Sequence, residues 1–165
     1  MEPEITLSTY GNTENSGIAD NLKFTYGITP LSNFQVGAGV GSGAKGFRFG
    51  GTYTFDFIPD LEGQLGAGLA LQAYYYKLKG SYSETDFTIY PYIHKLFKTA
   101  SGLNYDPFLA VPVGMAFYNG TYRSTWQMAV GANFKTAEHF LVTGEIGISL
   151  KDTDTYLSGG ITYRD

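Results

Sequence analysis

Hydrophobic and polar residues alternate along most of this chain, most strictly between Lys45 and Tyr76. In the first half of that stretch the odd positions are apolar, and the even positions are polar or glycine. The apolar set is Phe47, Phe49, Tyr53, Phe55 and Phe57. Successive side chains of a β-strand point to opposite faces, so the alternation predicts strands. Ile58-Pro59-Asp60 separates two such runs, which predicts a hairpin turn between them.

The same alternation predicts ten strands over the whole chain, which we treat as a single domain over residues 1–165. The predicted strands cover residues 3–11, 18–29, 33–43, 45–57, 61–79, 82–97, 104–119, 121–135, 138–151 and 153–164. The least regular region lies between Ile89 and Val113, because Pro91 and Pro112 fall inside strand-like runs and cannot donate to a β-ladder. We expect a bulge or a longer turn there. A barrel of eight strands, with this region irregular, is the alternative.

The connections between predicted strands are of two kinds. Turns that contain Pro30 or Pro59 lie at one end of the strands, which we call the turn rim. The other end, the loop rim, carries the remaining connections, at residues 12–17, 43–46, 79–83, 119–120 and 151–154. All of them are short, which argues against adhesion, protease or receptor roles that need long loops.

The apolar face of the predicted strands is too large to point inward. The interior of a packed barrel holds only about three layers of four side chains, far fewer than this face carries. The opposite, polar face carries glycines such as Gly37, Gly39, Gly66 and Gly68, which suit a narrow lumen. The central part of the apolar face carries no charged residue, as expected where a basic side chain at the bilayer midplane costs about 2 to 4 kcal/mol. The pattern therefore predicts an all-β, closed, antiparallel, up-and-down transmembrane barrel, with the lipid bilayer as its surroundings.

Composition supports this class and excludes others. Charged residues make up 16% and aromatic residues 16% of the chain, with 22 glycines. The net charge of -4 argues against the basic surface that a nucleic-acid-binding protein needs. The chain has no cysteine, which excludes disulfides and thiolate metal sites, and no apolar run is long enough for a transmembrane helix. The segment 1–4 lacks the basic start and apolar core of a signal peptide, so we expect an exported protein in its mature form.

The polar face carries the candidate functional residues. Its charged members are Lys23, Arg48, Asp56, Glu62, Asp86, His94, Asp106, Arg123, Glu145 and Lys151. Arg48 and Glu145 fall on opposite strands of a ten-stranded barrel, so a pair between them would bridge the lumen. We assign Arg48, Glu145, Lys23, Arg123, Glu62 and Tyr74 to a lumen constriction that sets ion selectivity. The alternative is a structural network, because charges in a lumen pair with one another whether or not anything permeates.

Catalytic and metal chemistry find little support in the sequence. The two histidines, His94 and His139, could act as bases. No nucleophile motif accompanies either of them, and no cluster of His, Asp or Glu has the spacing of metal ligands. We therefore expect no enzymatic activity, no metal and no cofactor.

Three features together give the chain a resemblance to a known class: the alternating strands, the turns Thr29-Pro30-Leu31 and Ile58-Pro59-Asp60, and the last strand-like segment 158–163. Over its whole length it resembles the small OmpA-like and OmpX-like outer-membrane barrels. It departs from them in ending Tyr163-Arg164-Asp165 instead of in Phe and in its short loops. Both departures would also suit a designed membrane barrel, although Pro91 and Pro112 argue against an idealised design.

The resemblance implies a bacterial-type outer membrane as the location. We expect a monomer that forms a narrow passive pore for ions or very small solutes. A closed structural or surface barrel without transport and a lipid-modifying membrane enzyme are the alternatives.

Overall fold

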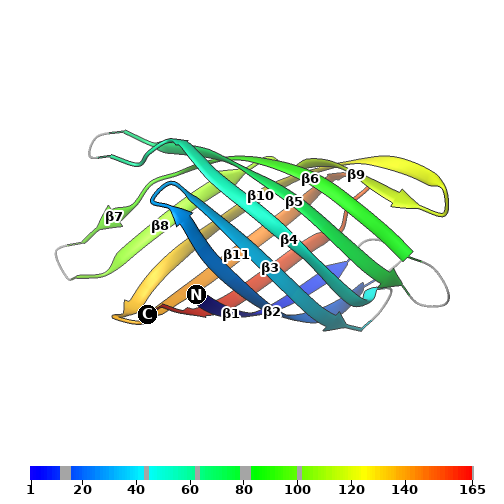
Figure 1. Ribbon diagram of the computed structural model, residues 1–165, viewed down its shortest axis with the longest axis horizontal. Coiled ribbons are helices and arrows are strands. Elements are labelled where there is room, and N and C mark those ends of the chain that lie inside the picture. The colour runs from blue at the N-terminus through cyan, green and yellow to red at the C-terminus, as the bar shows by residue number, and fades with distance from the viewer. Residues whose placement is uncertain (12–15, 43–44, 62–63, 79–82, 100–101, 165) are drawn as a thin grey trace.

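The computed structural model describes the whole chain except residues 12–15, 43–44, 62–63, 79–82, 100–101 and 165. Long strands run side by side at a steep tilt (Figure 1). In chain order they are β1 (Glu2–Gly11), β2 (Ser16–Thr29), β3 (Ser32–Gly41), β4 (Lys45–Ile58), β5 (Gly66–Leu78), β6 (Ser83–His94), β7 (Phe97–Lys98), β8 (Asn104–Ala110), β9 (Val113–Tyr118), β10 (Thr121–Ala137), β11 (Phe140–Lys151) and β12 (Thr155–Tyr163). In the described part of the chain, no helix is long and apolar enough to cross a membrane.

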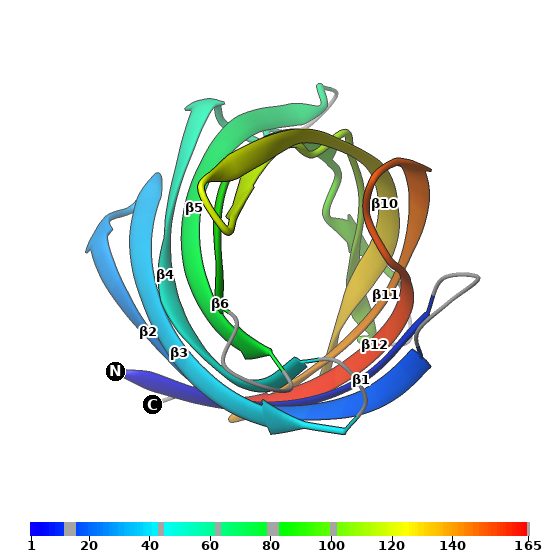
Figure 2. The ribbon, with the colours of Figure 1, turned by 90° about the vertical axis from the view of Figure 1, so that its right-hand side faces the viewer.

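The sheet closes on itself, because β1 pairs with both β2 and β12. Every pairing is antiparallel, and Figure 2 shows the resulting ring of strands seen along the barrel. β8 and β9 lie end to end between β6 and β10, and the two-residue β7 extends the pairing at the start of β8. The wall is therefore a ring of ten strands. This confirms the predicted up-and-down barrel and rules out the eight-stranded alternative.

The region that contains Pro91 and Pro112 is only partly as expected. Pro91 lies inside β6 opposite Leu69 and does not interrupt that strand. Pro112 falls in the gap between β8 and β9, but Ala110 pairs with Ala129 and Val113 with Trp126, so the register against β10 does not shift. Within the described residues of this region the ladder has no bulge, because carbonyl oxygens still accept hydrogen bonds where the prolines cannot donate. The longer turn is present, between β6 and β8 at the turn rim.

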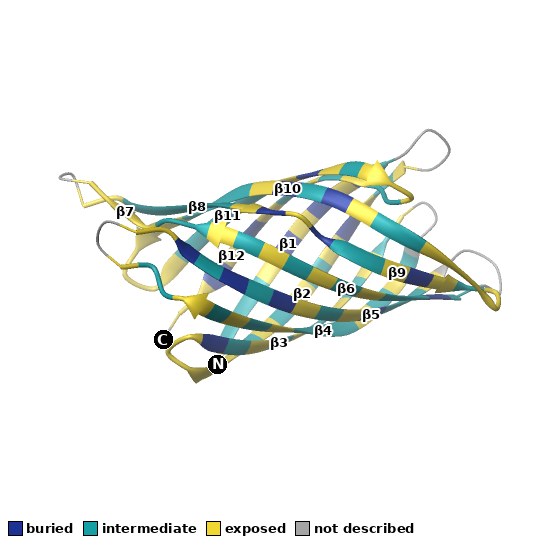
Figure 3. Ribbon diagram, turned by 90° about the horizontal axis from the view of Figure 1, so that it is seen from above, coloured by how far each residue is buried: buried dark blue, intermediate teal, exposed yellow. Residues whose placement is uncertain are grey.

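The outer face is apolar and the inner face is polar. On β1, Ile5 and Leu7 are 67% and 53% exposed, whereas Thr6 between them is 5% exposed. The same alternation of exposed and buried positions runs along the strands in Figure 3. Among the described residues no large side chain is fully buried, so the fold has no central hydrophobic core. This arrangement is the reverse of a soluble barrel and suits a wall that faces lipid.

A lysine holds the turn rim together where the chain passes from β4 to β5. Lys95 Nζ donates to Asp60 Oδ1 at 2.7 Å, to the Leu61 carbonyl at 2.7 Å and to the Gln64 carbonyl at 2.6 Å. The Leu96 backbone N–H donates to the other Asp60 oxygen at 2.5 Å. The carbonyl oxygens of Leu61 and Gln64 thus accept hydrogen bonds within the turn. β5 therefore begins at Gly66 and not at residue 61 as predicted.

We expect Asp60→Asn to destabilise the barrel by about 1 to 3 kcal/mol at pH 7, because it removes a charge-assisted pair. The hydrogen bond from Lys95, and next the one from Leu96, hold the pKa of Asp60 below its usual value. A lowered folded-state pKa stabilises the fold above the unfolded value of about 3.9. That contribution is lost as the pH falls through the folded value. Urea titrations in lipid vesicles at pH 7 and near pH 3 should therefore show a larger difference between wild type and variant at pH 7 than near pH 3.

Lys95→Met is the control for that pH dependence. It should lower the free energy of unfolding at pH 7. In the Lys95→Met variant, the additional change Asp60→Asn should lower this free energy only a little further. An Asp60→Asn effect of equal size at both pH values would contradict the assignment.

Candidate functional site

The barrel encloses a cavity of about 610 Å³. At the loop rim its wall includes Asp152 and Asp154, from the turn between β11 and β12, and deeper in the barrel it includes Glu4, Gln35 and Thr143. Every strand except β7 and β8 contributes to the lining. Hydroxyl, amide and charged groups dominate this lining, because the inward positions of each strand are the polar ones.

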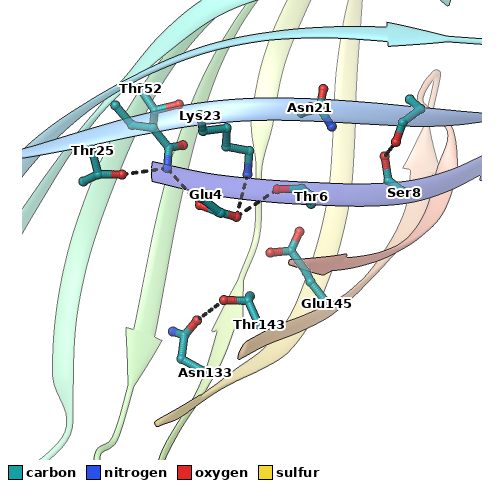
Figure 4. Close-up of polar contacts among 12 residues, drawn as sticks. Glu4, Thr6, Ser8, Asn21, Lys23, Thr25, Thr52, Asn133, Thr143 and Glu145 are labelled. Atoms are coloured by element: carbon teal, nitrogen blue, oxygen red, sulfur yellow. Dashed lines mark hydrogen bonds and ion pairs between the residues drawn. The ribbon is translucent and has the colours of Figure 1, made fainter. Parts of the chain in front are cut away.

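Glu4 is the centre of a polar network on the wall formed by β1, β2 and β3 (Figure 4). One of its carboxylate oxygens accepts hydrogen bonds from Lys23 Nζ at 3.3 Å and from Thr6 Oγ1 at 2.9 Å. The other accepts from Gln35 Nε2 at 3.2 Å, and that amide also donates to Thr25 Oγ1 at 3.0 Å. Lys23 and Glu4 therefore form an ion pair on one side of the lumen.

Arg48 lies nearer the loop rim and is held by neutral groups. Its Nε donates to Asn21 Oδ1, and a terminal nitrogen lies 3.4 Å from Ser8 Oγ. Among the described residues Arg48 and Glu145 do not form an ion pair. The prediction of an ion pair across the lumen is therefore wrong. The guanidinium of Arg48 hydrogen-bonds to Asn21 and Ser8 instead.

Glu145, on β11, accepts a hydrogen bond from the Tyr156 hydroxyl of β12. It lines the same cavity as Lys23 and Glu4, although no hydrogen bond links it to either. Glu145 thus shares the middle of the lumen with the Lys23 and Glu4 pair.

A second ion pair lies toward the loop rim. A terminal nitrogen of Arg123 on β10 lies 2.7 Å from Glu84 Oε2 on β6. The Glu84 side chain is 5% exposed, whereas the Arg123 side chain is 51% exposed. A buried carboxylate of this kind needs its partner, so the pair fixes Arg123 against the wall beneath the mouth.

Aromatic rings occupy the lumen beside inward glycines. A Cβ atom on Gly147 would overlap the ring of Tyr156, and one on Gly50 would lie 2.6 Å from Cγ of Tyr74. These glycines leave room for the tyrosine rings.

At the turn rim a separate group, the turn-side layer, consists of Asp56, Tyr92, His94 and Asp106. His94 Nδ1 lies 3.1 Å from Asp106 Oδ1, its Nε2 lies 3.9 Å from Asp56 Oδ1, and the Tyr92 hydroxyl donates to Asp56. None of these four side chains lines the 610 Å³ cavity. In the described part of the chain, no serine or threonine hydroxyl hydrogen-bonds to His94, and no group of His, Cys, Asp or Glu could hold a metal ion.

The structure places five of the six assigned constriction residues on the cavity wall; they are Lys23, Arg48, Tyr74, Arg123 and Glu145. Glu62 lies outside the described residues. Lys151, also expected in the lumen, is exposed, contacts Ser124 Oγ at 2.7 Å and does not line the cavity. The role of the five as a constriction stays a prediction.

Sequence reasoning missed two of the paired carboxylates, Glu4 and Glu84. Both occupy inward positions of their strands, one residue before the outward Ile5 and Thr85 respectively. The same alternation that identified Lys23 and Arg48 could have found them.

No protein-family model matches the chain, and no curated protein sequence matches it significantly. Solved structures do match. The beta domain of the Bordetella autotransporter BrkA has a TM-score of 0.66 at 8% identity, covering 99% of this chain and 98% of that chain. An outer-membrane channel from Pseudomonas putida F1 has a TM-score of 0.50 at 10% identity, covering 98% and 93%. LpxR from Salmonella typhimurium has a TM-score of 0.50 at 10% identity, covering 100% of both chains.

These likenesses show the fold, a closed β-barrel of the outer-membrane type. An autotransporter domain and a channel share it, so the fold by itself does not specify an activity. The function has to be argued from the lumen.

Proposed function

We propose that this chain is a monomeric barrel of a bacterial outer membrane that forms a narrow passive pore for ions or very small solutes. The observation that carries the proposal is the polar cavity of about 610 Å³ inside a wall whose outer face is apolar. Such a wall suits lipid, and such a lumen suits water and ions. Closure of β1 on β12 within one chain leaves no sheet edge that a second copy would have to cover.

The proposal assigns the constriction to Arg48, Glu145 and Lys23, with Arg123 and Tyr74 on the path toward the loop rim. Their charged or hydroxyl groups project into the cavity from different sides of the wall. Ion channels commonly control passage by such groups at a narrow point.

The proposal includes no catalytic activity. Acyl hydrolysis of the Ser-His-acid kind needs a nucleophile within hydrogen-bond reach of its base. The described contacts of His94 are to carboxylates, and His139 Nδ1 lies 2.9 Å from the Arg164 carbonyl.

A closed barrel without transport is the second candidate, and one observation favours it. The Tyr92 ring packs over Gly68, and the Phe108 ring packs over Gly131, both near the turn-side layer. Rings in these positions narrow the lumen between the cavity and the turn rim.

Single-channel recording in a planar bilayer tests the proposal, with Arg48→Ala and Glu145→Ala beside the wild type. We expect steady openings of uniform size, larger by about twofold or less in either variant because a shorter side chain widens the path. Phe49→Ala and Ile146→Ala are matched controls, since they shorten the adjacent side chains that face lipid, and should leave the conductance unchanged.

A silent bilayer would contradict the pore if heat-modifiable gel mobility shows that the barrel is folded. That result would favour the closed barrel.

A further inference from the structure

The cavity does not extend equally far toward the turn rim on all sides of the barrel. Near the turn-rim ends of β1, β11 and β12 its wall still includes Glu4, Thr143 and Gly160. On the opposite side the lining stops earlier, at Ala70 on β5 and Tyr90 on β6, and the described strand β8 contributes no lining residue. The side chains between these residues and the turn rim therefore close this side of the lumen.

Two aromatic rings lie in this closed part of the lumen, Tyr92 on β6 and Phe108 on β8. The Tyr92 ring reaches across Gly68 of β5, and its hydroxyl donates a hydrogen bond to Asp56 on β4. The Phe108 ring lies over Gly131 of β10, the residue with which Phe108 pairs. The two rings therefore extend over the inner wall between β4 and β10.

The residues around the rings are buried although they face the lumen. Ala110 pairs with Tyr92 and also with Ala129, so both alanines lie on the inner face of the wall. They are 5% and 1% exposed, and neither lines the cavity. The His94 ring lies 5.9 Å from the Tyr92 ring, and its Nε2 is buried with no hydrogen-bond partner among the described residues. Side chains therefore fill the lumen at this level.

We propose that the rings of Tyr92 and Phe108 set the size limit of the pore, an inference that rests on the proposed function. The narrowest section of a path decides which solutes pass, and its radius follows from the side chains that line it. The charged groups of the wider cavity act on ions, whereas the two rings leave a passage only along β1, β11 and β12. Because glycine and alanine lie beside both rings, shortening either ring widens the lumen directly.

Single-channel recording of Phe108→Ala and of Tyr92→Ala beside the wild type tests the inference. We expect the conductance to rise by more than about twofold in each variant, because the narrowest section widens. Poly(ethylene glycol) molecules of increasing size should lower the conductance of the wild type only when they are small, and larger ones should also enter each variant. Leu109→Ala is the matched control for Phe108→Ala. It shortens the next side chain of β8, which faces lipid, and should change neither the conductance nor the polymer size limit.

Thiol labelling in detergent micelles is a second test that needs no current, since the chain has no native cysteine. Ala110→Cys places a thiol beside both rings with little change in volume. A charged methanethiosulfonate should label this thiol about tenfold or more faster once Phe108→Ala is added, because the ring no longer covers it. Thr125→Cys, on the cavity wall of β10, is the control and should be labelled at the same rate with and without Phe108→Ala.

The outcomes separate the two proposals. Steady openings of the same size in the wild type and in both ring variants would overturn the size limit and leave the pore standing. A silent wild type beside a conducting Phe108→Ala would overturn the open pore but support the rings as the block. Equally fast labelling of Ala110→Cys with and without Phe108→Ala would overturn the role of the rings whatever the current shows. A folded barrel that is silent in every variant would overturn the pore and its size limit together.

Discussion

Leu71→Arg should destabilise the folded barrel by about 2 to 4 kcal/mol, the cost of a basic side chain at the bilayer midplane. Leu71 lies near the middle of β5, points outward and is flanked on the neighbouring strands by Tyr53 and Ile89. All three side chains are uncharged and exposed on the outer face. In lipid an arginine here would have no water and no carboxylate on its own face with which to pair.

The measurement is a urea titration of the refolded protein in lipid vesicles. The fluorescence of Trp126, the one tryptophan of the chain, would report on folding because this residue faces outward. Leu150→Arg is the matched control, since Leu150 also faces outward but lies next to the loop rim at the end of β11. It should cost only about 0 to 1 kcal/mol. Equal costs at the two depths would contradict a membrane-spanning wall.

Gly50→Ala should destabilise the barrel by about 1 to 3 kcal/mol, the usual cost of overpacking. A Cβ atom at Gly50 would overlap the carbonyl oxygen of Ala73 and would lie 2.6 Å from Cγ and 2.7 Å from Cα of Tyr74. Backbone atoms of a neighbouring strand cannot move aside as a flexible side chain can. The substitution therefore has to push β4 and β5 apart or displace the Tyr74 ring from the lumen wall.

Gly144→Ala is the control for Gly50→Ala, because a Cβ atom at Gly144 would have no other atom within 4 Å. Replacing a strand glycine by alanine reduces the entropy lost on folding, so this variant should be neutral or more stable by up to about 1 kcal/mol. The same urea titration compares the two. A Gly50→Ala variant as stable as Gly144→Ala would show that the rings do not pack against the glycines as described.

The path of the strands could be read from the sequence with few errors. The predicted strand 3–11 corresponds to β1, and the predicted strand 104–119 corresponds to β8 and β9 together. The main errors in strand limits are at the turn rim, where β5 begins later and β6 ends earlier than predicted. Those limits depend on Lys95, whose contacts reach across the rim to Asp60 and to carbonyls that alternation cannot reveal.

The sequence predicted which residues line the candidate site but not which contacts these residues form. Alternation assigned Lys23, Arg48 and Glu145 to the inner face, and the structure finds all three on the cavity wall. The one predicted pair, Arg48 with Glu145, does not form, because Arg48 binds Asn21 and Ser8. The pairing of Lys23 with Glu4 was not predicted.

Sequence alternation is enough to assign each side chain to one face of the wall and to identify the face that meets lipid. The physical reason is local: the side-chain period of a strand is two residues, and too many apolar groups lie on one face to fit inside. The contacts between lumen charges, in contrast, depend on the three-dimensional arrangement of the strands. Their heights depend on the stagger between neighbouring strands and on the closure of β1 against β12, and both are properties of the whole barrel. The pairing of Lys23 with Glu4 and of Arg123 with Glu84 therefore became visible only in the closed barrel.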